Sequence, residues 1–225
     1  MTAPTEGFRQ HRFVAPPGAT RILLVRHGES APAHPDRPFP LAGGHGDPPL
    51  HPDGEAQAIA VGERLAATES IDAIYVTTLQ RTHQTAEPLA QLTGIRPVVE
   101  ADFREVHLGE WEGGELRVRA AAGDPAFLDA MARQRWDLIP GAEPLADFDR
   151  RLQAALKRVV AAHPDQTVVA VVHGGVIGQL LAHAVGIEGF AFVGSDNASI
   201  SELVVVGERQ VLRRFNDTAH LDTTA

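Results

Sequence analysis

The most constraining feature of this sequence is an alternation between short apolar runs and longer segments of helical composition. A run such as Ile22–Val25 contains only aliphatic residues, which is typical of a strand buried on both faces. Predicted strands are Arg21–Val25, Ile71–Val76, Ile95–Val99, Thr167–Val172, Ser199–Val206 and Gln210–Phe215, and predicted helices are Asp53–Thr68, Thr77–Leu92, Leu145–Ala162 and Gly175–Ala184. This order predicts an α/β fold with an open, mainly parallel sheet and helices on both faces.

Three segments depart from the alternation. Residues 31–52 hold seven prolines and three glycines, which predicts a long loop without regular structure. Residues 110–141 mix tryptophan, glycine and proline, which indicates an irregular or short-helical insertion that forms a small cap. Residues 1–20 carry prolines and glycines but no apolar signal segment, so we expect a flexible arm before a single domain over residues 21–221.

Composition excludes several classes of function. The net charge of −9 argues against a general nucleic-acid or anionic-membrane surface. The chain has no cysteine, which excludes thiolate nucleophiles, disulfides and cysteine-based metal sites. The apolar stretch Val168–Gly186 contains His173, Gln179 and His183, so a strand, turn and helix explain it better than a membrane span. We therefore expect a cytoplasmic protein without nucleic-acid or membrane partners.

Two predicted strands end in a histidine followed by glycine. His27 and Gly28 follow the first strand, and His173 and Gly174 follow the strand that ends at Val172. Ligands of such sheets bind beyond the carboxyl ends of the strands, and glycine lets a ligand approach backbone N–H groups closely. A lone histidine is usually a core or capping residue, but two at the ends of strands in one sheet favour a shared binding site.

Arginine adds the chemistry of the expected ligand. Arg26 precedes His27, and Arg81 follows the strand that ends at Val76. A guanidinium presents a planar fork that matches two phosphoryl oxygens. Together with the two histidines, these arginines predict a cationic pocket for a phosphate group on an acidic protein.

Four ordered segments and the C-terminal segment carry a family resemblance. They are Leu24–Ser30, Leu79–Ala86, Phe103–Gly113, Val172–Ile177 and Asn216–Leu221. In these segments the chain resembles the histidine phosphatase superfamily, the phosphoglycerate mutase-like proteins, from about residue 21 to residue 221. The resemblance implies a phosphoglycerate mutase-like fold with a small inserted cap.

The resemblance also implies roles for individual residues. His27 matches the nucleophile that becomes a phosphohistidine, and Glu105 matches the general acid that protonates the leaving alcohol oxygen. The positions that match phosphate-holding residues are Arg26, Arg81, His173 and Ser30, with the glycines Gly28 and Gly174 beside them. Neighbouring guanidiniums disfavour a protonated His27, so they keep its nitrogen available for attack. No metal or other cofactor is implied.

The loop and the cap depart from the family pattern. Pro32 and Ala33 stand where family members commonly have Trp-Asn, which puts phosphate contacts from this loop in doubt. The loop histidines His34, His45 and His51 lack the spacing of a helical metal site, so solvated positions or substrate contacts are favoured over metal binding. The cap carries four arginines that at least as many acidic residues balance, which does not indicate a cationic lid: Arg117, Arg119, Arg133 and Arg135.

These features predict a phosphomonoester hydrolase that acts on a small phosphorylated metabolite through a phosphohistidine. One alternative is phosphoryl transfer of the phosphoglycerate mutase type, which calls for a closed pocket with additional basic groups. The other is a module that binds phosphorylated ligands without turnover. Nothing in the sequence specifies an oligomeric state.

Overall fold

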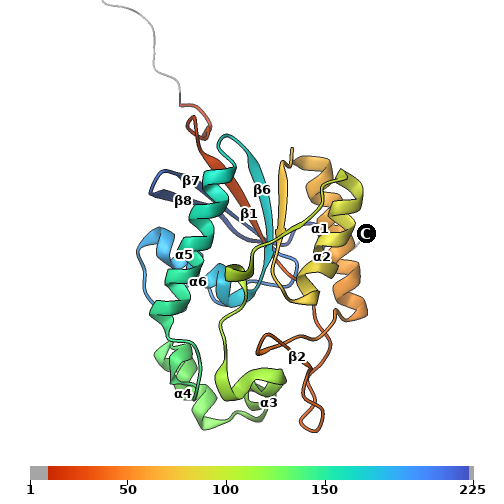
Figure 1. Ribbon diagram of the computed structural model, residues 1–225, viewed down its shortest axis with the longest axis vertical. Helices are drawn as coiled ribbons and strands as arrows, with labels where there is room; N and C mark the ends of the chain where they lie inside the picture. The colour runs from red at the N-terminus through yellow and green to blue at the C-terminus, as the bar shows by residue number, and fades with distance from the viewer. Residues whose placement is uncertain (1–9, 223–225) are drawn as a thin grey trace, which may run out of the picture.

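A six-stranded sheet forms the centre of the part of the chain that the computed structural model describes, residues 10–222 (Figure 1). Its strands lie in the order β5-β4-β6-β1-β7-β8. Strands β5, β4, β6 and β1 pair in parallel. Strand β7 pairs antiparallel with both β1 and β8. This arrangement confirms the predicted open, mainly parallel sheet. The bounds are β1 Thr20–Arg26, β4 Ala73–Val76, β5 Val98–Val99, β6 Thr167–Val172, β7 Ile200–Val206 and β8 Arg209–Asp217.

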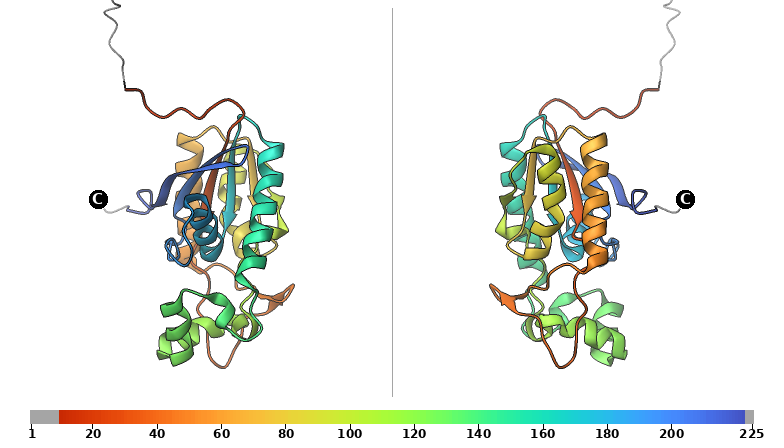
Figure 2. Two further views of the ribbon diagram at one scale, coloured as in Figure 1. Left: turned by 90° about the vertical axis from the view of Figure 1, so that its left-hand side faces the viewer. Right: turned by 90° about the vertical axis from the view of Figure 1, so that its right-hand side faces the viewer.

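Helices cover both faces of the sheet, as Figure 2 shows edge-on. Successive side chains of a strand point to opposite faces. Leu23 of β1 accordingly packs in one apolar cluster with α1 (Pro52–Thr68) and α2 (Gln80–Thr93), whereas Leu24 packs in another with α5 (Leu145–Ala162) and α6 (Gly174–Val185). The run Ile22–Val25 is apolar throughout because each of its side chains enters one of these two cores.

The register of β1 against β6 brings the two predicted histidines to one edge of the sheet. Arg26 pairs with Val172 at the last position of this ladder, so His27 and His173 leave the two strands at the same level. The backbone N–H of His27 donates to the carbonyl oxygen of Val172 at 3.0 Å. The position of both imidazoles therefore follows directly from parallel pairing.

The segment 31–52 contains a short hairpin, so the prediction that it lacks regular structure is wrong at this point. Strands β2 (Leu41–Ala42) and β3 (His45–Gly46) pair antiparallel. Gly43 and Gly44 join them with φ of +57° and +87°. Two adjacent glycines with positive φ form the kind of two-residue turn that matches the twist of paired strands, and they allow a hairpin here despite the prolines around it.

The segment 109–141, which we call the cap, lies beyond the carboxyl ends of the parallel strands (Figure 1). It consists of short helices, as predicted: η2 Gly109–Gly114, α3 Glu115–Ala122, α4 Pro125–Arg133 and η3 Trp136–Leu138. Its two ends meet at Gly109, where a Cβ would lie 2.2 Å from the carbonyl oxygen of Pro140. Only glycine fits this approach, which brings the ends of the insertion together.

Other local predictions differ from the structure by a few residues. Helix α2 begins at Gln80 rather than Thr77, because Thr77 to Leu79 form a turn, and a single 3₁₀ turn, η1 (Ala101–Phe103), was not predicted. Residues 10–19 contain no helix or strand, and the remainder of the predicted arm, residues 1–9, lies outside the described residues. No helix within residues 10–222 has the length and apolar character that crossing a membrane requires.

Candidate active site

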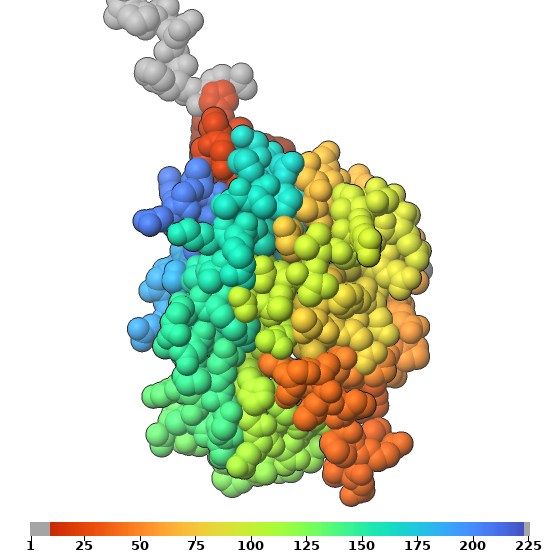
Figure 3. Space-filling view, in the orientation of Figure 1, coloured from red at the N-terminus to blue at the C-terminus, as the bar shows by residue number. Residues whose placement is uncertain are grey.

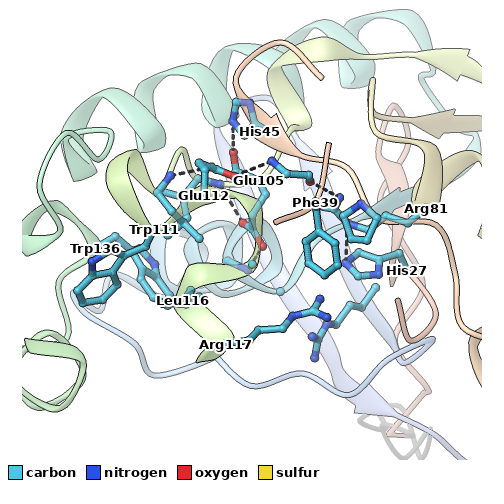
Figure 4. Close-up of a pocket in the computed structure, with 18 of the residues that line it drawn as sticks. His27, Phe39, His45, Arg81, Glu105, Trp111, Glu112, Leu116, Arg117 and Trp136 are labelled. Carbon is cyan, nitrogen blue, oxygen red and sulfur yellow. Dashed lines mark hydrogen bonds between the residues drawn. The ribbon is translucent and has the colours of Figure 1, made fainter. Parts of the chain in front are cut away.

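A cavity of about 290 Å³ lies between the sheet edge, the β2–β3 hairpin and the cap. The hairpin and the cap are neighbours on the molecular surface (Figure 3) and are joined by a hydrogen bond from the N–H of Gly46 to Glu112 at 2.7 Å. Five of the predicted site residues line this cavity: Arg26, His27, Arg81, Glu105 and Gly174. Figure 4 labels His27, Arg81 and Glu105.

His27 is buried, and its two ring nitrogens have different partners. Nδ1 lies 2.7 Å from the carbonyl oxygen of Gly28, and Nε2 lies 3.2 Å from Nε of Arg81. Because a carbonyl only accepts and a guanidinium only donates, Nδ1 carries the proton and Nε2 presents a lone pair. Burial, followed by the charges of Arg81 and Arg26, lowers the pKa of His27 well below its ordinary value. The geometry and the lowered pKa both favour a neutral His27 ring whose Nε2 carries no proton.

Arg81 lies in the first turn of α2 and is almost fully buried. Besides His27, it donates from Nη1 to the carbonyl oxygen of Gly46 at 3.0 Å, and Asp47 lies 3.9 Å away. Burial lowers the pKa of Arg81 to about 10, so the guanidinium stays charged at neutral pH. Arg81 thus links His27 to the hairpin.

Arg26 ends strand β1 and donates from Nη1 to the carbonyl oxygen of Ser195. Its Nε is buried and has no hydrogen-bond partner among the described residues. A buried donor without a partner carries a desolvation cost of about 1–3 kcal/mol, and an anion in the cavity would remove that cost.

His173 is fully buried beside His27, with 5.2 Å between the ring centroids, and it is not part of the cavity wall. Its Nε2 lies 3.1 Å from Oγ1 of Thr77, and its Nδ1 has no partner within residues 10–222. Thr77 accepts the N–H of Leu79, which leaves the Thr77 proton for Nε2 of His173 or for Thr82. Donation to Nε2 places the ring proton on the unpartnered Nδ1. Burial, then Arg81, lowers the pKa of His173 well below its usual range.

Glu105 follows η1 and enters the cavity from the side of α6. Its Oε1 accepts the N–H of Val106 at 3.0 Å, and its Oε2 accepts the N–H of Gly175 at 3.1 Å. Burial raises the pKa of Glu105, although these two hydrogen bonds act in the opposite direction. A Cβ at Gly175 would lie only 2.4 Å from Oε1, so glycine at this position is what admits the carboxyl group.

Gly28 and Ser30 do not line the cavity. The N–H of Gly28 donates to Oγ1 of Thr85 at 3.0 Å, so it is not available to a ligand, contrary to the sequence prediction. The reason for glycine here is packing, because a Cβ would lie 2.4 Å from the carbonyl oxygen of Gly54. Ser30 is buried, and its Oγ accepts from Nη2 of Arg117 at 2.7 Å.

Arg117 is a cavity residue that the sequence prediction missed. It lies in α3 and reaches across to the loop after β1, where it donates to Ser30 and to the carbonyl oxygen of Ala31. The other three cap arginines form ion pairs with acidic neighbours, as the charge balance suggested: Arg119 with Glu115 and Asp124, Arg133 with Asp129, and Arg135 with Asp137. Charge counting does not distinguish Arg117 from them, because what separates it is its contact with Ser30 and Ala31, which are distant in the sequence.

The loop histidines have separate environments. His45 is buried on the cavity wall, with Nε2 3.2 Å from the carbonyl oxygen of Glu105, and is not a solvated histidine. His51 caps α1 by accepting the N–H of Asp53. Within the described residues, His51, Glu29 and Asp53 are the one group whose spacing would allow a metal ion, and both carboxylates are exposed.

Comparison with known proteins agrees with the fold. Residues 22–218 match the sequence model of the histidine phosphatase superfamily, branch 1, and the chain belongs to this family. It is 30% identical over 211 residues to the metal-independent phosphoserine phosphatase of Arabidopsis thaliana, covering 91% of this chain and 84% of that protein. It is 34% identical over 166 residues to phosphoglycerate mutase-like protein 4 of the same plant, covering 72% and 70%. The structure of a mycobacterial glucosyl-3-phosphoglycerate phosphatase with inorganic phosphate superposes with a TM-score of 0.71 at 29% identity, covering 89% and 98%.

Proposed function

We propose that this protein is a phosphomonoester hydrolase that works through a phosphohistidine at Nε2 of His27. The observation that carries the proposal is the state of this nitrogen. It is unprotonated, lines a cavity and lies among guanidiniums, with a carboxyl group of raised pKa on the same wall. The names of the phosphatases to which the chain is similar support the same activity.

In the first step, the Nε2 lone pair attacks the phosphorus atom and the bond to the ester oxygen breaks. Arg26 and Arg81 balance the charge that spreads over the phosphoryl oxygens, and Nδ1–H of His173 is a further candidate donor from the buried side. Glu105, whose pKa burial raises, gives a proton to the leaving oxygen in this step. The alcohol departs and the phosphoryl group remains on His27.

In the second step, water attacks the phosphohistidine and Glu105 takes one of its protons. The P–N bond breaks, inorganic phosphate leaves and His27 regains its lone pair. Neither reaction step is an oxidation or a reduction. A mutase would return the phosphoryl group to a second substrate oxygen instead, and a binding module would stop before the first step.

Two measurements test the proposal. Orthophosphate release from simple phosphomonoesters, run beside 2- and 3-phosphoglycerate interconversion, separates hydrolysis from mutase activity and from binding alone. Rapid quenching with radiolabelled ester should leave acid-labile, alkali-resistant label on the native protein. His27→Ala should abolish label and turnover, whereas His34→Ala, at an exposed loop histidine, should retain both. Full turnover by His27→Ala would disprove the assignment of the nucleophile.

A further inference from the structure

The cavity has a cationic end around His27. Arg81 donates to Nε2 of His27 at 3.2 Å, Arg26 is the adjacent residue, and Figure 4 shows Arg117 reaching toward the same side of the cavity. Arg117 is held there by its hydrogen bonds to Ser30 and Ala31. A single phosphoryl group accounts for this concentration of positive charge.

The opposite end of the cavity is apolar. Figure 4 shows Trp111, Trp136 and Leu116 together on the side away from His27, with Phe39 between them and the nucleophile. Leu108 and Val193 also line the cavity. The two indole rings belong to the apolar core that joins the cap to the sheet.

Two polar side chains near the apolar wall have protein partners. The two oxygens of Glu112 accept the N–H groups of Gly46 at 2.7 Å and Leu108 at 2.9 Å. The ring nitrogens of His45 lie 3.3 Å from the carbonyl oxygen of Gly43 and 3.2 Å from that of Glu105, and a neutral imidazole donates to only one of them. Among the described residues that line the cavity, no lysine or arginine beyond the three around His27 is present to pair with a second anion.

We propose that the substrate is a phosphomonoester whose alcohol carries an uncharged, apolar group of about the size of an aromatic ring. This inference rests on the proposed function, because it concerns the leaving group of that reaction. An apolar group would contact the wall formed by Trp111, Trp136 and Leu116. A carboxylate on the alcohol would lose its hydration there, with no arginine or lysine beyond those around His27 to pair with it.

Three primary-alcohol phosphates test this substrate class. 2-Phenylethyl phosphate carries the ring, ethyl phosphate has nearly the same leaving group without it, and O-phosphoserine carries charges. We expect kcat/KM to be at least about tenfold higher for 2-phenylethyl phosphate than for ethyl phosphate, since one ring-sized apolar contact contributes that much or more. O-Phosphoserine should be no better than ethyl phosphate.

The outcomes separate the two proposals. Absence of hydrolysis of all three esters refutes the proposed function. Hydrolysis that favours O-phosphoserine, or that does not distinguish ethyl from 2-phenylethyl phosphate, leaves the phosphatase intact and refutes the apolar substrate class.

A pair of cap variants tests where the preference arises. Leu116→Asn replaces an apolar side chain of the cavity wall by a polar one of similar size. Leu128→Asn makes the same exchange at an exposed position of α4 outside the wall. The ratio of kcat/KM for 2-phenylethyl and ethyl phosphate should fall severalfold in Leu116→Asn and stay at the native value in Leu128→Asn. Because the ratio is taken within each variant, loss of folded protein does not affect it. An unchanged ratio in Leu116→Asn would overturn the proposal.

Discussion

Replacing Gly175 by alanine tests the role of Glu105 without removing its carboxyl group. The added Cβ would lie 2.4 Å from Oε1 of Glu105, whereas an ordinary contact begins at 3.4 Å. The carboxyl group must therefore retreat by about 1 Å, and a displacement of about 1 Å in an active site costs up to about 10²-fold in rate. This loss corresponds to about 2.7 kcal/mol of transition-state stabilisation.

The assay compares two leaving groups. Ethyl phosphate needs a proton on its departing oxygen, whereas p-nitrophenyl phosphate releases a stable phenolate and needs little protonation. In Gly175→Ala, kcat/KM should fall about 10²-fold for ethyl phosphate and far less for p-nitrophenyl phosphate. Alanine has the higher helix propensity, by about 1 kcal/mol, so circular dichroism and thermal unfolding should show a folded protein.

Gly174→Ala is the matched control, one residue earlier in the same helical turn. Its Cβ would lie 3.5 Å from Nε of Arg26 and away from Glu105, so any loss acts on the phosphoryl group that both esters share and should be equal for the two. Equal losses on the two esters in Gly175→Ala, or no loss on ethyl phosphate, would refute the argument that Glu105 is the general acid.

Two further predictions follow from the same site. Thr77→Val removes the hydroxyl group that can donate to Nε2 of His173, so kcat should fall about tenfold, as expected for one hydrogen bond of about 1.5 kcal/mol, while Thr77→Ser keeps native activity. Two-bond ¹⁵N–¹H coupling should show the His173 proton on Nδ1 in the native protein; the same tautomer distribution in Thr77→Val would contradict this role. The pH profile of kcat/KM should have an acidic limb from protonation of His27, whose pKa burial lowers, and an alkaline limb from ionisation of Glu105, whose pKa burial raises. Activity is lost below the pKa of His27 and above the pKa of Glu105. Glu105→Gln should lose the alkaline limb and keep the acidic one. Ionisation of the substrate affects the native enzyme and the variant alike, so it does not account for this difference.

The sequence predicts the central part of the fold because local patterns determine it. The apolar runs at Ile22–Val25 and Thr167–Val172 can only be buried strands, and both are found in the middle of the sheet. Parallel pairing then brings the residues after both strands to one edge, so the proximity of His27 and His173 is predictable from their position in each run.

Where the chain lacks a periodic pattern, the sequence predicts less. The prolines around Gly43-Gly44 obscure the turn that these glycines form, and the motif at Gly28 predicts an N–H open to a ligand although this N–H donates to Thr85. The hairpin depends on a turn geometry that the surrounding composition obscures. The partner of Gly28 is a residue far away in the sequence.

The sequence by itself determined the layered α/β architecture, the family and the two histidines at the sheet edge, because these follow from periodicity and from motifs of adjacent residues. Only the tertiary structure decided that Arg117 joins the cavity, that Thr77 contacts His173, and that Trp111 and Trp136 form an apolar wall opposite the nucleophile. These contacts join the hairpin, the cap and the sheet across tens of residues. Their positions depend on how separate elements pack, and no local pattern encodes that packing.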